Sequence, residues 1–124
     1  MVLRHPQSAQ CVDAKTGSIS EAEFQSQIVD IARLFGYRIA HFRAGKTVHG
    51  WRTPVQGDGA GFPDCVMCKP GRLIFAELKR GKAKPTLEQQ AWIDDLATTG
   101  AESYLWRTTD DLQEIAEILK GRKT

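Results

Sequence analysis

Three charged residues interrupt an otherwise apolar pair of expected strands in the middle of the chain. Asp64 begins the first strand of GFPDCVMCKPGRLIFAELKR, and Glu77 and Lys79 lie near the end of the second. If the turn is centred on Pro70-Gly71, Asp64 and Glu77 pair directly across the hairpin and share one face of it. Lys79 follows Glu77 by two residues, so it points to that same face.

Two opposed carboxylates destabilise a hairpin unless a positive charge lies between them. A hard divalent cation such as Mg²⁺, which takes carboxylate oxygens and keeps several waters, fits this position. The alternative is a surface hairpin in which Lys79 only forms a salt bridge with a carboxylate. The register also depends on the turn, because a three-residue loop would shift the pairing by one and place Asp64 and Glu77 on opposite faces.

The helix expected before the first strand adds a third carboxylate. Ser20 and Glu23 form an S-x-x-E capping box, which predicts that the helix begins here. Glu21 falls within the apolar sector of this helix, where a carboxylate needs a cation, a lysine or an ordered water. Its other interpretation is simple complementarity to the helix dipole in the first turn.

A second helix brings Gln89 into a stripe of residues expected to face the core: Thr86, Trp92, Ile93 and Leu96. Thr86 and Gln89 also have capping-box spacing, which could be the whole role of Gln89.

The remaining pattern predicts an α/β fold with the order α-β-β-β-α-β-α, a mixed four-stranded sheet flanked by helices. We expect a flexible arm over 1–19 and one folded domain over 20–124, with 44–61 as a long loop or an irregular hairpin. The expected helices are 20–35, 86–99 and 110–120, and the expected strands are 37–43, 64–69, 72–79 and 102–107.

The composition of the chain indicates the cellular compartment in which this protein acts. No apolar run is long enough to span a membrane and no signal peptide is recognisable, and three cysteines do not form a disulfide framework. We therefore expect an intracellular, cytoplasmic protein without a membrane partner.

Residues 37–84 contain ten Lys or Arg against three Asp or Glu, whereas the whole chain has a net charge of only +2. A basic centre suits a phosphate-rich ligand, although a solvated surface would show the same charge.

The cysteines Cys65 and Cys68 have the spacing of a metal or redox motif. On a strand, however, residues three apart point to opposite faces, and no second Cys or His pair has ligand spacing. We interpret both as small buried apolar residues. His41 and His49 could approach the site, but lone histidines are more often structural or exposed.

Four motifs together resemble the PD-(D/E)XK (restriction-endonuclease-like) nuclease superfamily and, within it, the stand-alone VRR-NUC domains of phages and bacteria. They are GFPD (61–64), AELK (76–79), EAEFQ (21–25) and TLEQQAW (86–92), and their order covers about residues 20–119. The resemblance implies a metal-dependent DNA endonuclease. It also implies a homodimer that cuts branched DNA such as Holliday (four-way) junctions, in DNA repair or recombination.

The same resemblance assigns roles to individual residues. Asp64, Glu77 and the backbone carbonyl of Leu78 would hold Mg²⁺ or Mn²⁺, and Lys79 would orient or deprotonate the attacking water. Glu21 would bind the metal through water or steady the lysine, and Gln89 would support the site from farther away.

Basic and aromatic residues around this hairpin are expected to contact DNA: Arg43, Lys46, Trp51, Arg52, Arg80, Lys82 and Lys84. Trp51 could stack on an exposed base or cover the edge of the sheet. The alternatives for the whole protein are a nuclease that nicks or cuts ordinary duplex, and a non-catalytic DNA-binding accessory module with the same fold.

Overall fold

The structure is a computed structural model, and it describes residues 19–42, 45–47, 50–52 and 55–121, with only the backbone given for 45–47 and 50–52. The expected arm therefore lies outside the described residues except for Ile19, which packs against the core. The helices are α1 (Glu21–Leu34), α2 (Leu87–Ala97) and α3 (Leu112–Lys120). The strands are β1 (Arg38–His41), β2 (Gly45–Thr47), β3 (Gly50–Arg52), β4 (Cys65–Lys69), β5 (Arg72–Lys79) and β6 (Glu102–Arg107).

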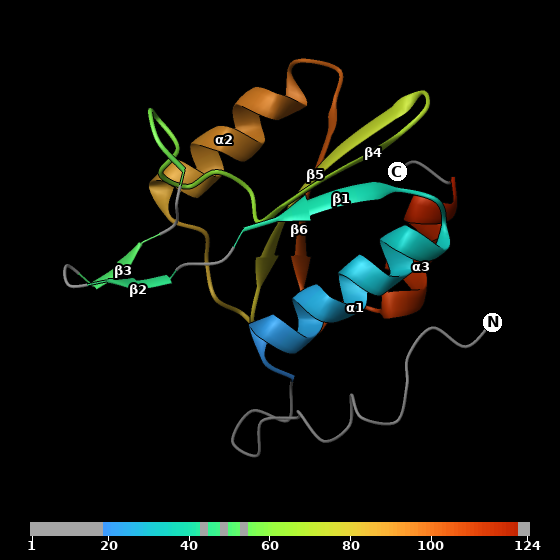
Figure 1. Cartoon of the computed structure of the whole chain (residues 1–124), viewed down its shortest axis with the longest axis horizontal. Helices are drawn as coiled ribbons and strands as arrows, with labels where there is room; N and C mark the ends of the chain where they lie inside the picture. Colours follow the sequence, from blue (N-terminus) through green and yellow to red (C-terminus); the bar gives the residue numbers. More distant parts are fainter. Residues whose placement is uncertain (1–18, 43–44, 48–49, 53–54, 122–124) are drawn as a thin grey trace.

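The main sheet is mixed and four-stranded, with the order β1-β4-β5-β6. β1, β4 and β5 are antiparallel neighbours, and β6 lies parallel to β5, to which α2 connects it. The prediction of an α/β fold with a mixed four-stranded sheet and three helices is confirmed. A separate antiparallel pair, β2–β3, projects beyond the end of β1 (Figure 1). The segment 44–61 thus contains a hairpin, one of the two forms expected for it.

The helices cover the sheet in two layers. α1 and α3 pack together on one face, and α2 lies on the other (Figure 1). The core forms between the sheet and the α1–α3 layer, and its largest fully buried side chains include Phe24, Ile28, Met67, Ile74 and Leu119. These residues follow a helical period in α1 and alternate along β4 and β5, as burial of one face requires.

Helix α2 differs from the expectation that its apolar stripe faces the core. None of its residues is fully buried, and Trp92, Ile93 and Leu96 are only half-buried. The reason is that α2 covers its face of the sheet alone, whereas α1 and α3 enclose the other face together. Trp92 instead meets the ring of Phe62 edge-to-face, with 5.0 Å between ring centroids.

Close backbone contact fixes the N-terminal turn of α2 against the loop before β4. Gly61 has a φ of +81°, and a Cβ at this position would lie 2.5 Å from the carbonyl carbon of Glu88. Only glycine avoids both the strained backbone angle and this overlap. The GFPD motif therefore has a packing reason for its glycine, independent of any chemistry.

The two strand cysteines are not equivalent. Cys65 is buried on the core side, as predicted, whereas the expectation that Cys68 is buried is wrong, because it is exposed. Residues three apart on β4 face opposite sides, and α2 leaves the far end of its face of the sheet open.

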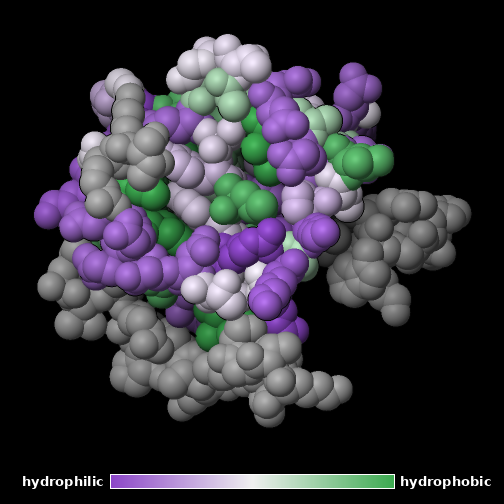
Figure 2. Space-filling view, turned by 180° about the vertical axis from the view of Figure 1, so that it is seen from behind, coloured by the Kyte–Doolittle hydropathy of each residue, from purple (hydrophilic) through white to green (hydrophobic). Residues whose placement is uncertain are grey.

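No helix within the described ranges has the length and apolarity that crossing a membrane requires. Seen from behind, the described surface is mostly hydrophilic, with hydrophobic residues in small separate patches (Figure 2).

Candidate active site

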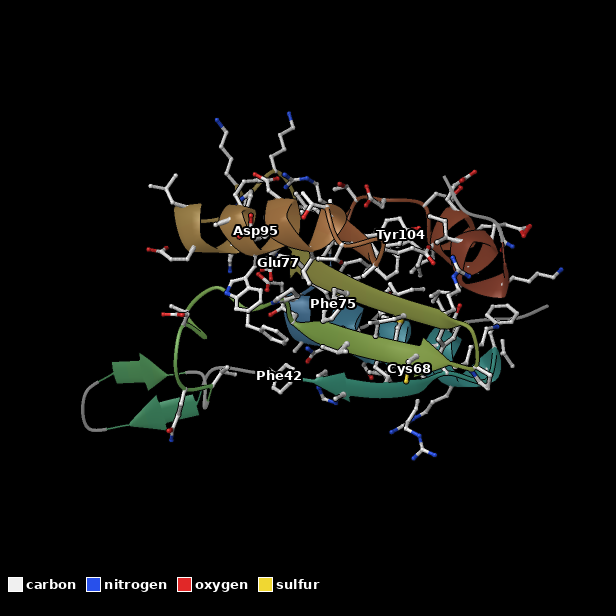
Figure 3. The ribbon with its side chains drawn as sticks, turned by 90° about the horizontal axis from the view of Figure 1, so that it is seen from above. Phe42, Cys68, Phe75, Glu77, Asp95 and Tyr104 are labelled. Atoms are coloured by element: carbon white, nitrogen blue, oxygen red, sulfur yellow. The ribbon has the colours of Figure 1, made fainter. Side chains whose placement is uncertain are left out.

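The register of the β4–β5 hairpin brings Asp64 and Glu77 together. Cys65 pairs with Ala76 at one end of the hairpin and Lys69 with Arg72 at the other, so the residue opposite Glu77 is Asp64. The register predicted from the Pro-Gly turn is confirmed. Seen from the α2 side, Glu77 lies at the end of β5, two residues beyond Phe75 on the same face (Figure 3).

Three contacts define the site at the end of β5. The backbone N–H of Leu78 donates a hydrogen bond to Asp64 Oδ2 at 2.8 Å. The carboxyl groups of Asp64 and Glu77 lie within hydrogen-bonding reach of each other. Lys79 Nζ lies 3.7 Å from Glu77 Oε2, and its charge also lowers the pKa of Asp64, so one cation acts on both carboxylates.

Glu77 is a buried acid, and its described neighbours satisfy only one of its two carboxylate oxygens. It is only 2% exposed, and within the described part of the chain its Oε1 has no hydrogen-bond partner. Desolvation first, and then the nearby charge of Asp64, raise the pKa of Glu77 to about 8. Desolvation also raises the pKa of Asp64, although the N–H of Leu78 opposes that shift. Without a cation, this pair therefore tends to keep a proton.

The raised pKa of Glu77 predicts how the metal-free protein responds to pH. The folded chain binds this proton more tightly than the unfolded chain, where the pKa is near 4.5. The resulting stability is complete below the unfolded pKa and is lost as the pH rises through the folded pKa. Between about pH 5.5 and 8.5 we expect wild type to lose on the order of 2 kcal/mol relative to Glu77→Gln. Urea unfolding in a chelator would measure this, and parallel pH profiles for the two proteins would contradict it.

Glu21 lies at the margin of the same site, at the first position of α1. The residue is exposed, so its predicted inward orientation does not extend to burial of the whole side chain. Its pKa is nevertheless raised, first by desolvation of the carboxyl group and then by Asp64. Lys79 and Arg80 act in the opposite direction, so both cations are neighbours of Glu21. The structure thus brings Glu21 to the edge of the Asp64–Glu77 pair.

Gln89 is engaged in capping α2. Its Oε1 accepts a hydrogen bond from the N–H of Thr86 at 2.8 Å, and its own N–H donates to Thr86 Oγ1 at 3.1 Å. The structure confirms the capping-box interpretation, and a further role for Gln89 in the site stays a prediction. At the N-terminus of α1, Ser20 Oγ likewise accepts from the N–H of Glu23 at 3.1 Å.

The expected DNA-contacting residues fall into two groups. Arg80 is half-buried beside Glu21, and Lys82 and Lys84 are exposed on the connection from β5 to α2. Arg43 lies outside the described residues, and the side chains of Lys46, Trp51 and Arg52 are not described. For the latter group, the backbone shows that Lys46 pairs with Trp51 in the β2–β3 hairpin.

A buried glutamine supports the site in a way that the sequence analysis missed. Gln25 is 6% exposed, and its Nε2 donates to the carbonyl of Phe42 at 3.5 Å. The N–H of Phe42 in turn donates to the carbonyl of Asp64 at 2.9 Å. Gln25 also bonds the thiol of Cys65, whose pKa burial raises to about 12. The available signal was its place one helical turn after Glu21, at the edge of the apolar sector.

The donor set suits a hard cation that keeps part of its water shell. Across the described residues, no group of three or more His, Cys, Asp or Glu side chains forms a ready metal cage. Two carboxylates are nevertheless sufficient for Mg²⁺, which is commonly held by one or two of them. The unpartnered Oε1 of Glu77 is the observation that fits a cation, because a buried carboxylate oxygen without a donor is unfavourable.

Comparison of this chain with protein-family models, curated proteins and solved structures found no match. The resemblance to VRR-NUC domains therefore stays a prediction, and the candidate site rests on its own geometry.

Proposed function

We propose that this protein is a metal-dependent DNA endonuclease with a PD-(D/E)XK core of the VRR-NUC type, and that it acts on branched DNA. The observation that supports this most strongly is the meeting of Asp64, Glu77 and Lys79 at the end of β5, with Glu77 buried and one of its oxygens unpartnered. An ion pair that only stabilises the fold would need one carboxylate. Here two carboxylates, Asp64 and Glu77, face the same lysine, Lys79.

Asp64, Glu77 and the Leu78 carbonyl would hold Mg²⁺ or Mn²⁺. Such an ion lowers the pKa of a bound water and neutralises phosphate oxygens. The chain's own part is to exclude water from Glu77, to hold Asp64 through the N–H of Leu78 and to place a positive charge at Lys79 Nζ. That charge would orient the attacking water and balance negative charge as the phosphodiester is cut.

The basic connection after β5 supports a nucleic-acid substrate. Arg80, Lys82 and Lys84 follow the catalytic strand directly, and such residues bind phosphates without reading sequence. Symmetric cutting of a four-way junction needs two sites, so we propose that the active form is a two-fold dimer.

A cleavage assay tests this proposal. Purified protein would be incubated with four-way junction, flap, duplex and single-stranded DNA, in Mg²⁺, Mn²⁺ or chelator. We expect cutting of branched DNA that requires metal and falls by about a hundredfold or more in Asp64→Asn, which keeps the shape of Asp64 but removes its charge. Arg38→Ala, at an exposed position on β1, is the control.

Three results would change the assignment. Metal-dependent cutting that survives Asp64→Asn would overturn the site. Equal cutting of ordinary duplex would favour a nicking or restriction-like nuclease. Binding of DNA without cutting under either metal would favour the accessory module.

A further inference from the structure

The connection between β5 and α2 is held to the end of β6 by hydrogen bonds. Arg107 Nη1 donates to the carbonyl of Gly81 at 3.0 Å and also to the carbonyl of Ala83. The N–H of Gly81 donates to Thr108 Oγ1 at 2.9 Å, and the N–H of Thr108 donates to the carbonyl of Lys79 at 3.0 Å. Two residues of β6 and its following turn therefore hold the start of the connection.

The sheet register explains why Arg107 can reach this connection. β5 and β6 are parallel, and Lys79 is paired with Arg107. Arg107 therefore lies on the same face as Glu77 and Lys79, next to the candidate site. Its own N–H donates to Asp110 Oδ2 at 2.8 Å, which anchors the turn after β6.

The connection itself forms a closed turn. The N–H of Ala83 donates to the carbonyl of Arg80 at 3.0 Å, and Gly81 has a φ of +55°. The two carbonyls that Arg107 binds flank Lys82, which is exposed. The backbone on both sides of this lysine is thus fixed relative to β5.

We propose that Arg107 and Thr108 are positioning residues that hold residues 80–84 as a preformed binding segment for the phosphates of a DNA strand entering the site. This inference rests on the proposed nuclease function. The cations that would contact phosphate are Arg80, Lys82 and Lys84. Arg107 and Thr108 act on the DNA only through the backbone of this segment. Holding the segment in advance lowers the entropic penalty of ordering it when DNA binds.

The tether can be tested first without DNA. In the free protein, Arg107→Ala is expected to raise the hydrogen-exchange rates of the Gly81 and Ala83 amides by about tenfold, because local opening becomes easier. Thr108→Val is expected to raise the rate of Gly81. Arg38→Ala serves as the exposed arginine control, with no change at either amide. Exchange rates unchanged in both tether variants would overturn the inference.

Binding to a four-way junction in chelator, where no cutting occurs, gives the second test. Arg107→Ala is expected to raise the dissociation constant by about tenfold. Thr108→Val is expected to raise it by a smaller factor, although it removes no charge. Arg107→Lys keeps the charge, but its side chain is one bond shorter and does not carry a nitrogen to the position of Arg107 Nη1, so we expect it to bind nearly as weakly as the alanine variant. In cleavage, the effect should fall on KM more than on kcat.

Two outcomes of this binding test would overturn the positioning role. One is wild-type affinity in Arg107→Lys together with wild-type affinity in Thr108→Val, which would show direct charge contact instead. The other is a wild-type protein that binds no DNA. If the protein binds junctions and the tether variants weaken that binding, but no metal supports cutting, the positioning role stands and the nuclease proposal fails.

Discussion

Lys79→Ala should lower metal-dependent cutting of branched DNA by about a thousandfold and leave the fold intact. Lys79 Nζ forms an ion pair with the buried Glu77, 3.7 Å from its Oε2. If the proposed function holds, the loss of Lys79 removes the positive charge expected to face the phosphate. Single-turnover cleavage of a labelled four-way junction in Mg²⁺ measures the effect on chemistry alone.

Two further variants make this test specific. Lys120→Ala removes the same charge from an exposed position at the end of α3 and should cut at the wild-type rate. Lys79→Arg should not restore activity, because its longer planar guanidinium does not place the positive charge where the compact ammonium of Lys79 lies. Wild-type cutting by Lys79→Ala would remove Lys79 from the proposed mechanism.

Arg72→Met should destabilise the protein by about 3–5 kcal/mol, the largest stability change that we expect. Arg72 lies at the opposite end of β5 from Lys79, and its side chain is 8% exposed. Its guanidinium bonds both carboxylate oxygens of Glu102 at 2.7 Å, and Nη1 also donates to Tyr37 Oη at 2.8 Å and to the carbonyl of Ile118 at 2.6 Å. Removing it leaves the half-buried Glu102 carboxylate without its cation and takes one donor from the carbonyl of Ile118.

A double-mutant cycle separates these contributions. Glu102→Gln alone should also destabilise, but the double variant should lose less than the two single changes together, because removing both charges leaves neither unpaired. Urea unfolding followed by circular dichroism gives each free energy of unfolding. Arg38→Met, at an exposed position on β1, should change stability by less than about 0.5 kcal/mol. Additive losses in the cycle would contradict a coupled network.

The hairpin could be predicted from its own residues. Alternating apolar residues mark β4 and β5, and Pro70-Gly71 marks the turn between them. The observed bounds of β5, Arg72–Lys79, match the expected strand. Because strand side chains alternate strictly, the turn alone decides which residues share a face, and this is why the Asp64–Glu77 pairing followed from the sequence.

The predictions that are wrong concern burial, which depends on contacts between distant segments. A local sequence pattern indicates which residues are apolar, but whether the stripe of α2 and Cys68 are buried depends on how many elements cover each face of the sheet. The tether from Arg107 to Gly81 and Ala83 has no local signal either. It exists because β6 lies parallel beside β5, and the order of the strands in the sheet is set by the tertiary fold.

By itself, the sequence determined the α/β class, the helix caps, the register of the central hairpin and the set of charges at its end. These features follow from periods of two and 3.6 residues and from turn and capping chemistry, all of which act over a few residues. The tertiary structure decided that Glu77 is buried with one oxygen unpartnered, that Glu21 and Arg80 border it, and that Arg107 holds the basic connection. Burial and electrostatic environment arise when elements far apart in the chain pack together, so local sequence patterns do not predict them.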